Sequence, residues 1–279
     1  MALASLASQT VLDWECILVD DGSSDDSGTL VRRFDDQRLR PFRLHENQGR
    51  PIAREIALGK ARGKYLCMLD ADDWYYPRKL EEQLEVLESN PNLSLLGTGM
   101  AIVDSGMELL AIRAEKHDHT GDSEVGRTFL RLGRPPISHA TAMIRRSEIT
   151  QAHFDPQFEV AEDVDFLLQV LWGRQFSELP EPLYAYEEPD AANVDEMRLA
   201  LRSLQGVFWK HRNLGPSRAF REIAVAWCKS LIYSAVVPLG LGDRIVRRRS
   251  TQPKSKEKED FYRARTEVRQ LAQGMFETG

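Results

Sequence analysis

The chain has 279 residues, 42% of them hydrophobic and 29% charged, with a net charge of −6 and a pI near 5.6. This composition is typical of a globular protein, and the length suits one large α/β domain with an appendage. The acidic balance excludes a general nucleic-acid-binding protein, which would carry a basic stripe. Three widely spaced cysteines, Cys16, Cys67 and Cys228, favour a reducing cytoplasm, and we expect no secretory signal.

Strand and helix patterns alternate in the first half of the chain. We predict strands over residues 16–19, 39–45, 65–69 and 93–104. A helix is expected after the acidic turn at 20–26, another from Pro51 to Gly63, and a third beginning at Pro77. This alternation predicts a doubly wound parallel sheet, in which ligands bind outside the carboxyl ends of the strands.

The chain changes character at about residue 196. Residues 196–235 are expected to be helical. Residues 223–242 are apolar but interrupted by Lys229 and Pro238, so they make a poor transmembrane segment. Two alternatives remain: an interfacial element whose basic flank (244–249) faces anionic lipid, or a helix pair that packs on the core. Residues 250–260 are expected to form a mobile linker and 261–273 a short terminal helix.

Two acidic clusters follow predicted strands: Asp20 and Asp21 after the first, and Asp70, Asp72 and Asp73 after the third. Neighbouring carboxylates repel one another, and burial makes each one costlier, so a compensating cation is expected if they leave solvent. An Asp-x-Asp at a strand end can hold Mg²⁺ or Mn²⁺ against a diphosphate. The alternative is a helix cap on a solvated surface.

A third acidic pair, Glu162 and Asp163, opens a predicted helix. The apolar face of that helix consists of Val164, Leu167, Leu168 and Leu171. Acids in a first turn stabilise the helix dipole by about 0.3–1 kcal/mol each, which explains the pair without a function. A general base that deprotonates a hydroxyl would use the same residue types.

Three segments together resemble the family-2 inverting glycosyltransferases of the GT-A fold: "WECILVDDGSSDDS", "ENQGRPIAREIALGKARGKYLCMLDADDW" and "FEVAEDVDFLLQVL". They follow the family order, and the resemblance extends from about residue 2 to 190. It implies a GT-A domain over residues 1–195, which is Rossmann-like with a mixed, mainly parallel sheet flanked by helices. Residues 196–279 would form a C-terminal helical extension with a basic linker.

The resemblance also implies the roles of particular residues. Asp20 and Asp21 match the acids that receive the nucleotide base and ribose, and Arg54 matches a position that contacts the base or supports its pocket. Asp70 is implied to bind the ribose and the metal, and Asp72 the metal and the diphosphate. The implied cofactor is Mg²⁺ or Mn²⁺, and the implied donor is a nucleotide-diphosphate sugar, with uracil as the base by family frequency.

Glu162 and Asp163 match the catalytic pair of the family, with Asp163 as the base and Glu162 in support of the acceptor or metal site. His139 could touch the acceptor or the diphosphate, or could be a satisfied structural histidine. Trp74 and Trp172 are expected to serve packing rather than sugar stacking.

Two departures from the family pattern stand out. The apolar first strand of the family is absent, because the chain begins in what matches the following helix, and we hypothesise a truncated start. Many relatives carry a His after the tyrosine that matches Tyr186, where this chain has Glu187 and Glu188, so Glu188 could substitute as a metal ligand. The motif and spanning helices of processive membrane polymerases are missing.

The expected function is therefore inverting sugar transfer to a hydroxyl of a glycan, lipid-linked or protein acceptor in cell-surface or lipid-linked glycan synthesis. The expected location is the cytoplasm, with a peripheral contact to the inner face of the plasma membrane through residues 223–249 as one option. The alternative is a non-catalytic nucleotide-sugar-binding relative that acts as a partner domain. A nucleotidyltransferase would need a Gly-rich basic loop near the start, which is not visible.

Overall fold

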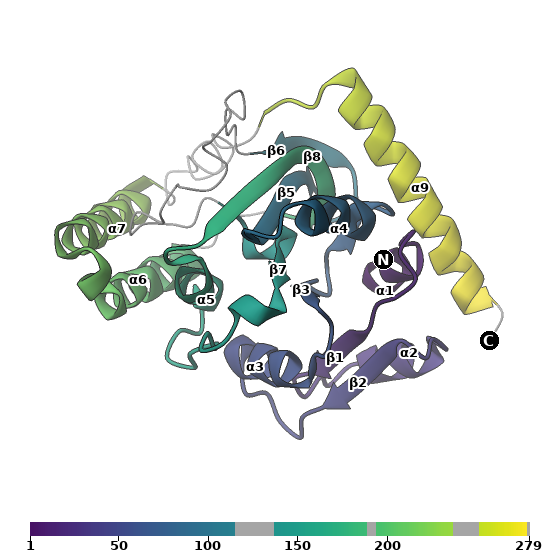
Figure 1. Cartoon of the computed structure of the whole chain (residues 1–279), viewed down its shortest axis with the longest axis horizontal. Helices are drawn as coiled ribbons and strands as arrows, with labels where there is room; N and C mark the ends of the chain where they lie inside the picture. The colour runs from purple at the N-terminus through teal and green to yellow at the C-terminus, as the bar shows by residue number, and fades with distance from the viewer. Residues whose placement is uncertain (115–136, 189–193, 237–250, 278–279) are drawn as a thin grey trace.

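The computed structural model describes residues 1–114, 137–188, 194–236 and 251–277 (Figure 1). The helices are α1 Ala2–Ala7, α2 Ser27–Arg33, α3 Arg50–Lys60, α4 Lys79–Ser89, α5 Glu162–Leu171, α6 Val194–Lys210, α7 Pro216–Val236 and α9 Ser255–Glu277. The strands are β1 Cys16–Asp20, β2 Leu39–Arg43, β3 Tyr65–Cys67, β4 Trp74–Tyr75, β5 Leu93–Val103, β6 Leu109–Arg113, β7 Met143–Arg145 and β8 Gln175–Glu187.

The main sheet has six strands in the order β3-β7-β5-β8-β4, with β6 also paired to β5. Among the described strands of this sheet, only β5 and β8 pair in parallel, and the other pairs are antiparallel. The prediction of a mainly parallel sheet is therefore wrong, and the sheet is mixed. The antiparallel pairs come from a hairpin, β5–β6, and from the strands β4 and β7, which are two and three residues long. Strands this short carry no readable periodicity.

Strand β5 is the centre of the core, and every one of its eleven residues is buried. Successive side chains point to opposite faces of a strand. Leu96, Met100 and Ile102 accordingly pack on the side of α4, whereas Leu95 contacts the cluster around α5. Because both faces of the strand are covered, apolar residues occur on both of them, and the polar Ser94 and Thr98 are buried as well.

Strands β1 and β2 form a separate two-stranded parallel sheet. Helix α3 packs against β1 and lies beside the end of the main sheet that carries β3 (Figure 1). The predicted strands at 16–19, 39–45, 65–69 and 93–104 and the helices α3, α4 and α5 are confirmed, with small shifts of their bounds.

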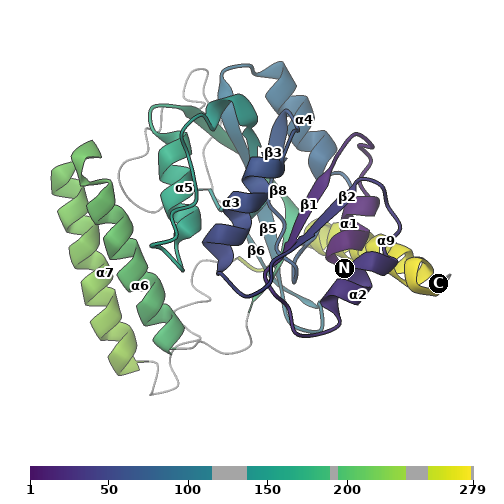
Figure 2. The same ribbon diagram turned by 90° about the horizontal axis from the view of Figure 1, so that it is seen from below.

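The predicted helical region after residue 195 consists of two helices, α6 and α7, which lie side by side. Figure 2 shows α5, α6 and α7 as successive layers, with α7 outermost. No helix in the described part of the chain is long and apolar enough to span a membrane. Residues 237–249, which belong to the expected membrane contact, lie outside the described residues.

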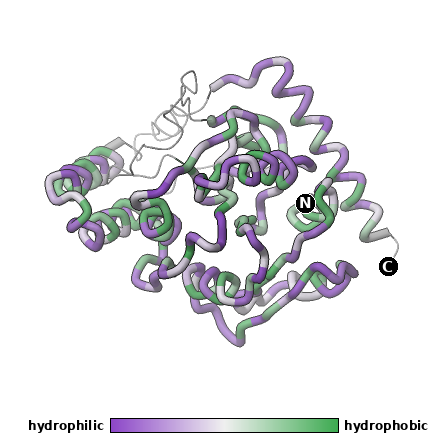
Figure 3. Tube along the Cα trace, in the orientation of Figure 1, coloured by the Kyte–Doolittle hydropathy of each residue, from purple (hydrophilic) through white to green (hydrophobic). Residues whose placement is uncertain are grey.

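The last helix, α9, begins at Ser255 and is longer than expected. The prediction of a mobile linker over 250–260 is therefore wrong for its second half. Although α9 is largely hydrophilic along its length (Figure 3), its apolar residues Phe261 and Val268 are fully buried against the main body. Phe261 packs on Trp74, with 5.6 Å between the ring centroids.

Candidate active site

Helix α5 begins at a strained position. Ala161, the residue before the helix, has φ 71° in the left-handed region, which is unfavourable for a residue with a Cβ atom. The next two residues diverge: Glu162 is 2% exposed, whereas Asp163 is half-buried and its Oδ1 accepts the backbone N–H of Val164 at 2.8 Å. The turn thus directs one carboxylate inward and leaves the other at the surface of the site.

Arg54 on α3 joins two of the predicted acidic motifs. Its Nη1 donates to Glu162 Oε1 at 2.7 Å and its Nη2 donates to Asp70 Oδ1 at 2.8 Å. The Arg54 side chain is only 11% exposed. Burial raises the pKa of Glu162, and the positive charge of Arg54 opposes that shift. The bridge brings together residues that lie 108 positions apart in the sequence, and the sequence motifs alone did not predict it.

Asp21 positions the start of the helix that carries Arg54. Its two carboxylate oxygens accept the backbone N–H groups of Gln48 and Gly49, each at 2.8 Å. Gly49 has φ 90°, which a residue with a side chain would adopt only with strain, and α3 begins at the next residue. Asp21 therefore has a structural role in this arrangement, whether or not it also contacts a ligand.

Asp20 closes β1 and turns the chain towards α2. Its Oδ1 accepts the backbone N–H of Ser23 at 2.8 Å, and its Oδ2 lies 3.5 Å from Arg43 Nε. The hydrogen bonds from Ser23 lower the pKa of Asp20, and Arg43 adds to this effect. The group is thus held as a carboxylate at the end of its strand, where the sequence predicts a ligand site.

Asp73 is a buried anchor for the loop that carries Asp70 and Asp72. It is 1% exposed and accepts hydrogen bonds from the Tyr184 hydroxyl at 2.5 Å and from the backbone N–H of Glu187 at 2.9 Å. Burial raises its pKa to about 7, against the lowering effect of those two donors. No sequence signal identifies these partners, because they lie on β8, more than a hundred residues further along the chain.

The three expected metal ligands do not form a closed site. Asp70 has a 38% exposed side chain and is paired with Arg54, and Asp72 is exposed. Glu188 instead receives a hydrogen bond from Arg113 at 3.1 Å. Among the described residues no group of three or more His, Cys, Asp or Glu is arranged to hold a metal ion. The ligand role of Glu188 stays a prediction.

His139 is 4% exposed and lies edge-on to Phe154 and Phe166, with centroid distances of 5.7 and 5.5 Å. Burial and the nearby charge of Arg54 lower its pKa to about 3, so the ring is neutral at physiological pH. These surroundings favour the structural alternative. Trp74 is 1% exposed and stacks on Tyr76, as expected for packing, while Trp172 is 38% exposed.

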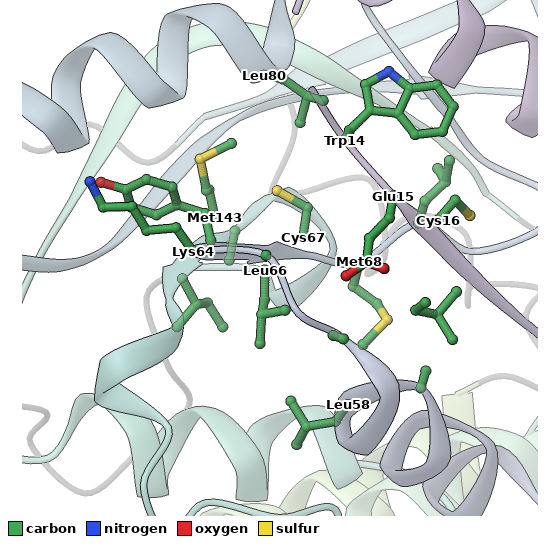
Figure 4. A pocket seen from close by; sticks show the side chains of 18 of the residues that line it. Trp14, Glu15, Cys16, Leu58, Lys64, Leu66, Cys67, Met68, Leu80 and Met143 are labelled. Carbon is green, nitrogen blue, oxygen red and sulfur yellow. The ribbon is translucent and has the colours of Figure 1, made fainter. Parts of the chain in front are cut away.

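An apolar cavity of about 720 Å³ separates β1 from β3. Figure 4 shows Cys16 of β1 on one side and Leu66 and Cys67 of β3 on the other, with Leu80 and Leu58 from the flanking helices. Within the described part of the chain, β1 pairs only with β2, and β3 only with β7. The facing edges of the two sheets therefore have no strand partner, and the cavity lies between them.

The sequence matches the family model "Glycosyl transferase family 2" over residues 1–152. An uncharacterized glycosyltransferase MJ1057 of Methanocaldococcus jannaschii is 25% identical over 85% of this chain and 81% of its own length. The putative teichuronic acid biosynthesis glycosyltransferase TuaG of Bacillus subtilis is 36% identical, covering 60% of this chain and 64% of its own. A third relative, the Escherichia coli UDP-Glc:alpha-D-GlcNAc-diphosphoundecaprenol beta-1,3-glucosyltransferase WfgD, is 32% identical over 37% of this chain and 41% of its own.

Two solved structures share the fold. S. aureus TarS 1–349 in complex with UDP-GlcNAc superposes with a TM-score of 0.61 at 18% identity, over 97% of this chain and 76% of that one. The mannosyltransferase PcManGT of Pyrobaculum calidifontis, in complex with GDP-Man and Mn²⁺, gives a TM-score of 0.57 at 15% identity, over 98% and 81%. The family match covers more than half of the chain and includes both strand-end acidic clusters. The chain is a member of glycosyl transferase family 2, with the mixed α/β fold of the GT-A glycosyltransferases.

Proposed function

We propose that the protein transfers a sugar from a nucleotide-diphosphate sugar to an acceptor hydroxyl, with inversion at the anomeric carbon. The observation that carries this proposal is the bridge from Arg54 to Asp70 and Glu162. It brings the Asp-x-Asp loop and the Glu162–Asp163 pair to one place, as a reaction between a donor and an acceptor requires.

The acids at the strand ends suit a metal-bound diphosphate. Asp70 and Asp72 are carboxylates with exposed oxygen atoms, and Mg²⁺ is commonly held by one or two carboxylates together with substrate phosphates. These two residues would hold Mg²⁺ or Mn²⁺, which supplies positive charge beside the departing diphosphate. Glu188 would join them only after leaving Arg113. Asp20 and Asp21 would receive the nucleoside.

Asp163 is the proposed general base. It accepts the proton of the acceptor hydroxyl while the hydroxyl oxygen forms a bond to the anomeric carbon. The bond from that carbon to the diphosphate oxygen breaks, and the nucleoside diphosphate leaves with the electron pair. Glu162 is buried and bonded to Arg54, so it positions the start of α5 rather than receiving the proton.

The relatives support a role in the synthesis of cell-surface or lipid-linked glycans. TuaG is named for teichuronic acid biosynthesis, and the name of WfgD specifies a UDP-sugar donor and a diphosphoundecaprenol-linked acceptor. We therefore propose a UDP-sugar as the donor and a cytoplasmic site of action. GDP remains an outcome of the test, since PcManGT was solved with GDP-Man.

One observation favours a second candidate, a non-catalytic nucleotide-sugar-binding partner domain. The cavity between β1 and β3 leaves the sheet divided beside the proposed nucleotide site. A divided sheet could weaken donor binding and remove turnover while the acidic residues stay in place.

The test combines binding with turnover. UDP, GDP and dTDP are titrated by calorimetry with Mn²⁺ and with EDTA, and sugar transfer is then followed with diphosphate sugars of the nucleotide that binds. We expect Asp163→Asn to keep donor binding and to lower turnover by about 10²–10⁴-fold, as is usual for loss of a general base. Equal turnover in both proteins would refute the role of Asp163. Metal-dependent binding without turnover in the wild type would support the partner-domain alternative.

A further inference from the structure

The outermost helix carries a row of large apolar side chains on its exposed side. We call this surface the α7 face, and it consists of Trp209 from the end of α6 and, from α7, Phe220, Val225, Trp227, Leu231 and Ile232. Their exposed fractions run from 39% for Val225 to 59% for Trp227. Contiguous exposed apolar surface of this kind marks an interaction site in soluble proteins.

Helical spacing places Phe220, Trp227 and Leu231 in one row, with Val225 and Ile232 about a third of a turn further round the same helix. Phe220, Trp227 and Leu231 recur at intervals of seven and four residues, which places them along one face. Ala219 and Ala226 are buried on the opposite face, which packs against α6. Trp209 joins the row because its ring lies edge-on to Phe220, with 6.1 Å between centroids.

The segment that carries this surface is basic, whereas the chain as a whole is acidic. Residues 194–236 contain seven Lys or Arg and three Asp or Glu, whereas the whole chain has a net charge of −6. Arg221 lies between the apolar residues, and its side chain is 69% exposed. Its neighbour Glu222 has a side chain only 21% exposed, and it is paired with Arg221 at 2.7 Å.

The apolar side chains and the basic charge together indicate which partner binds the α7 face. A second copy of the chain would place two positively charged surfaces against each other, which is unfavourable. An anionic bilayer satisfies both properties, since apolar side chains enter the acyl boundary by about 5–10 Å while basic side chains meet the headgroups. Tryptophan is enriched at that boundary. We propose that the α7 face binds the surface of an anionic lipid bilayer.

The α7 face has a fixed position relative to the candidate active site. Asp165 of α5 is fully buried, and its oxygen atoms lie 2.9 Å from Lys210 Nζ and 2.7 Å from His211 Nε2. Helix α5 therefore carries Asp163 in its first turn and, two residues later, Asp165, which holds the end of α6. Membrane binding would keep Asp163 at a set position relative to the lipid surface, a consequence that rests on the proposed function.

The test is co-sedimentation of the full chain with phosphatidylglycerol vesicles and with phosphatidylcholine vesicles. We expect binding to the anionic vesicles only, weakening as salt is added. Leu231→Ser/Ile232→Ser should weaken that binding by at least about tenfold, because two large apolar side chains no longer leave water. The matched control is Leu12→Ser/Leu110→Ser, which changes two exposed leucines, 74% and 41% exposed, away from this surface and should bind as the wild type does.

Three results would overturn the proposal. Equal vesicle binding by the wild type and the Leu231/Ile232 variant would assign the contact to another segment. Failure to bind, with a dimer in light scattering that the same variant abolishes, would assign the surface to a second copy. If the wild type does not bind the vesicles and is monomeric in light scattering, the α7 face has no role in lipid binding. The same variant should bind nucleotide as the wild type does in calorimetry. A failure of the proposed donor binding can therefore be told apart from a failure of the proposed lipid binding.

Discussion

At the scale of single residues, the site depends on one buried cation. Arg54 neutralises Glu162, whose side chain is 3% exposed, and also Asp70. Removing one partner of a buried ion pair leaves the other charge uncompensated and typically costs about 3–5 kcal/mol. We therefore expect Arg54→Ala to lower the free energy of unfolding by about 3 kcal/mol and to abolish nucleotide binding, as measured by urea unfolding and calorimetry.

Lys64→Ala is the matched control for that variant. Lys64 pairs with Glu88 at 2.6 Å, but the two side chains are 62% and 52% exposed. Solvent screens such a pair, so its loss should change the free energy of unfolding far less than the loss of Arg54 does. The double variant Arg54→Ala/Glu162→Gln should recover part of the lost stability, because the buried charge is gone. If Arg54→Ala proved as stable as Lys64→Ala, the bridge would not be a desolvated one.

The buried carboxyl of Asp73 makes a distinct contribution to the pH dependence of stability. Its pKa of about 7 in the folded state exceeds the ordinary value of 3.8, so between these values the folded state holds a proton that the unfolded state releases. Stability from this group therefore falls as pH rises through that window. His139 acts in the opposite sense: its pKa falls from 6.5 to about 3 on folding, so its contribution rises with pH over that range.

Because the two groups oppose each other, the test of Asp73 is a difference between proteins. We expect the stability of the wild type relative to Asp73→Asn to decline between about pH 4 and about pH 7, in urea unfolding at a series of pH values. Asp13→Asn, at an exposed position, should run parallel to the wild type. A constant difference between the wild type and Asp73→Asn would mean that this carboxyl does not titrate in that range.

At the scale of elements, the sequence predicted segments with a clear apolar pattern and missed others, including the thirteen-residue strand β8, whose pattern is interrupted by Pro180 and Pro182. Strand β5 is a long, mainly apolar run, and helices α3, α4 and α5 have apolar periodicity and clear end signals, so their prediction succeeded. Strands β4 and β7 have two and three residues, and only tertiary contacts define them. The acidic motifs could be located, but the partners that hold them, such as Tyr184 for Asp73, come from distant strands that no local pattern connects.

The cavity between β1 and β3 leads to a prediction about a whole strand. With ~3.3 Å of rise, ~4.8 Å between strands and ~10 Å between layers, a strand residue fills ~160 Å³, so the 720 Å³ cavity would hold ~4–5 residues. We expect that a Val/Ile-rich strand of this length, joined by a Gly/Asn loop to Met1, would pair with β1 and β3. Amide exchange of Ile17 and Cys67, whose N–H groups face the open edges of β1 and β3, should slow markedly, and the thermal midpoint should rise.

A Gly/Ser segment of the same length is the control for the added strand. It offers the same backbone but no apolar side chains for the cavity, so it should leave amide exchange and the thermal midpoint unchanged. If the apolar strand also left exchange at Ile17 and Cys67 unchanged, the prediction that a strand fits between β1 and β3 would be wrong. The same fusion bears on the proposed function. If donor binding is absent in this chain and returns with the added strand, the cause is the incomplete sheet and not a non-catalytic site.

At the scale of the whole molecule, we expect the charge of the chain to make donor binding depend on a metal ion. The chain has a net charge of −6, and Asp20, Asp21, Asp70 and Asp72 are grouped at the ends of β1 and β3, where an anionic diphosphate is expected to bind. Carboxylates and phosphates repel one another, so a divalent cation must compensate both. We expect UDP to raise the thermal midpoint only when Mn²⁺ or Mg²⁺ is present. Saturation at 100 times the dissociation constant corresponds to about 2.7 kcal/mol of added stability.

Two comparisons decide whether that stabilisation comes from the Asp-x-Asp loop. EDTA should remove the shift completely, and Asp72→Asn should remove most of it while leaving the midpoint of the unliganded protein unchanged, because Asp72 is exposed. Asp13→Asn, which is also exposed but lies before β1 and outside the Asp-x-Asp loop, should keep the full shift. A UDP-induced shift that survives EDTA would show that Arg54 and the backbone alone compensate the diphosphate. Asp70 would then have to release Arg54 to the phosphates, which would make their salt bridge an exchangeable contact rather than a fixed support.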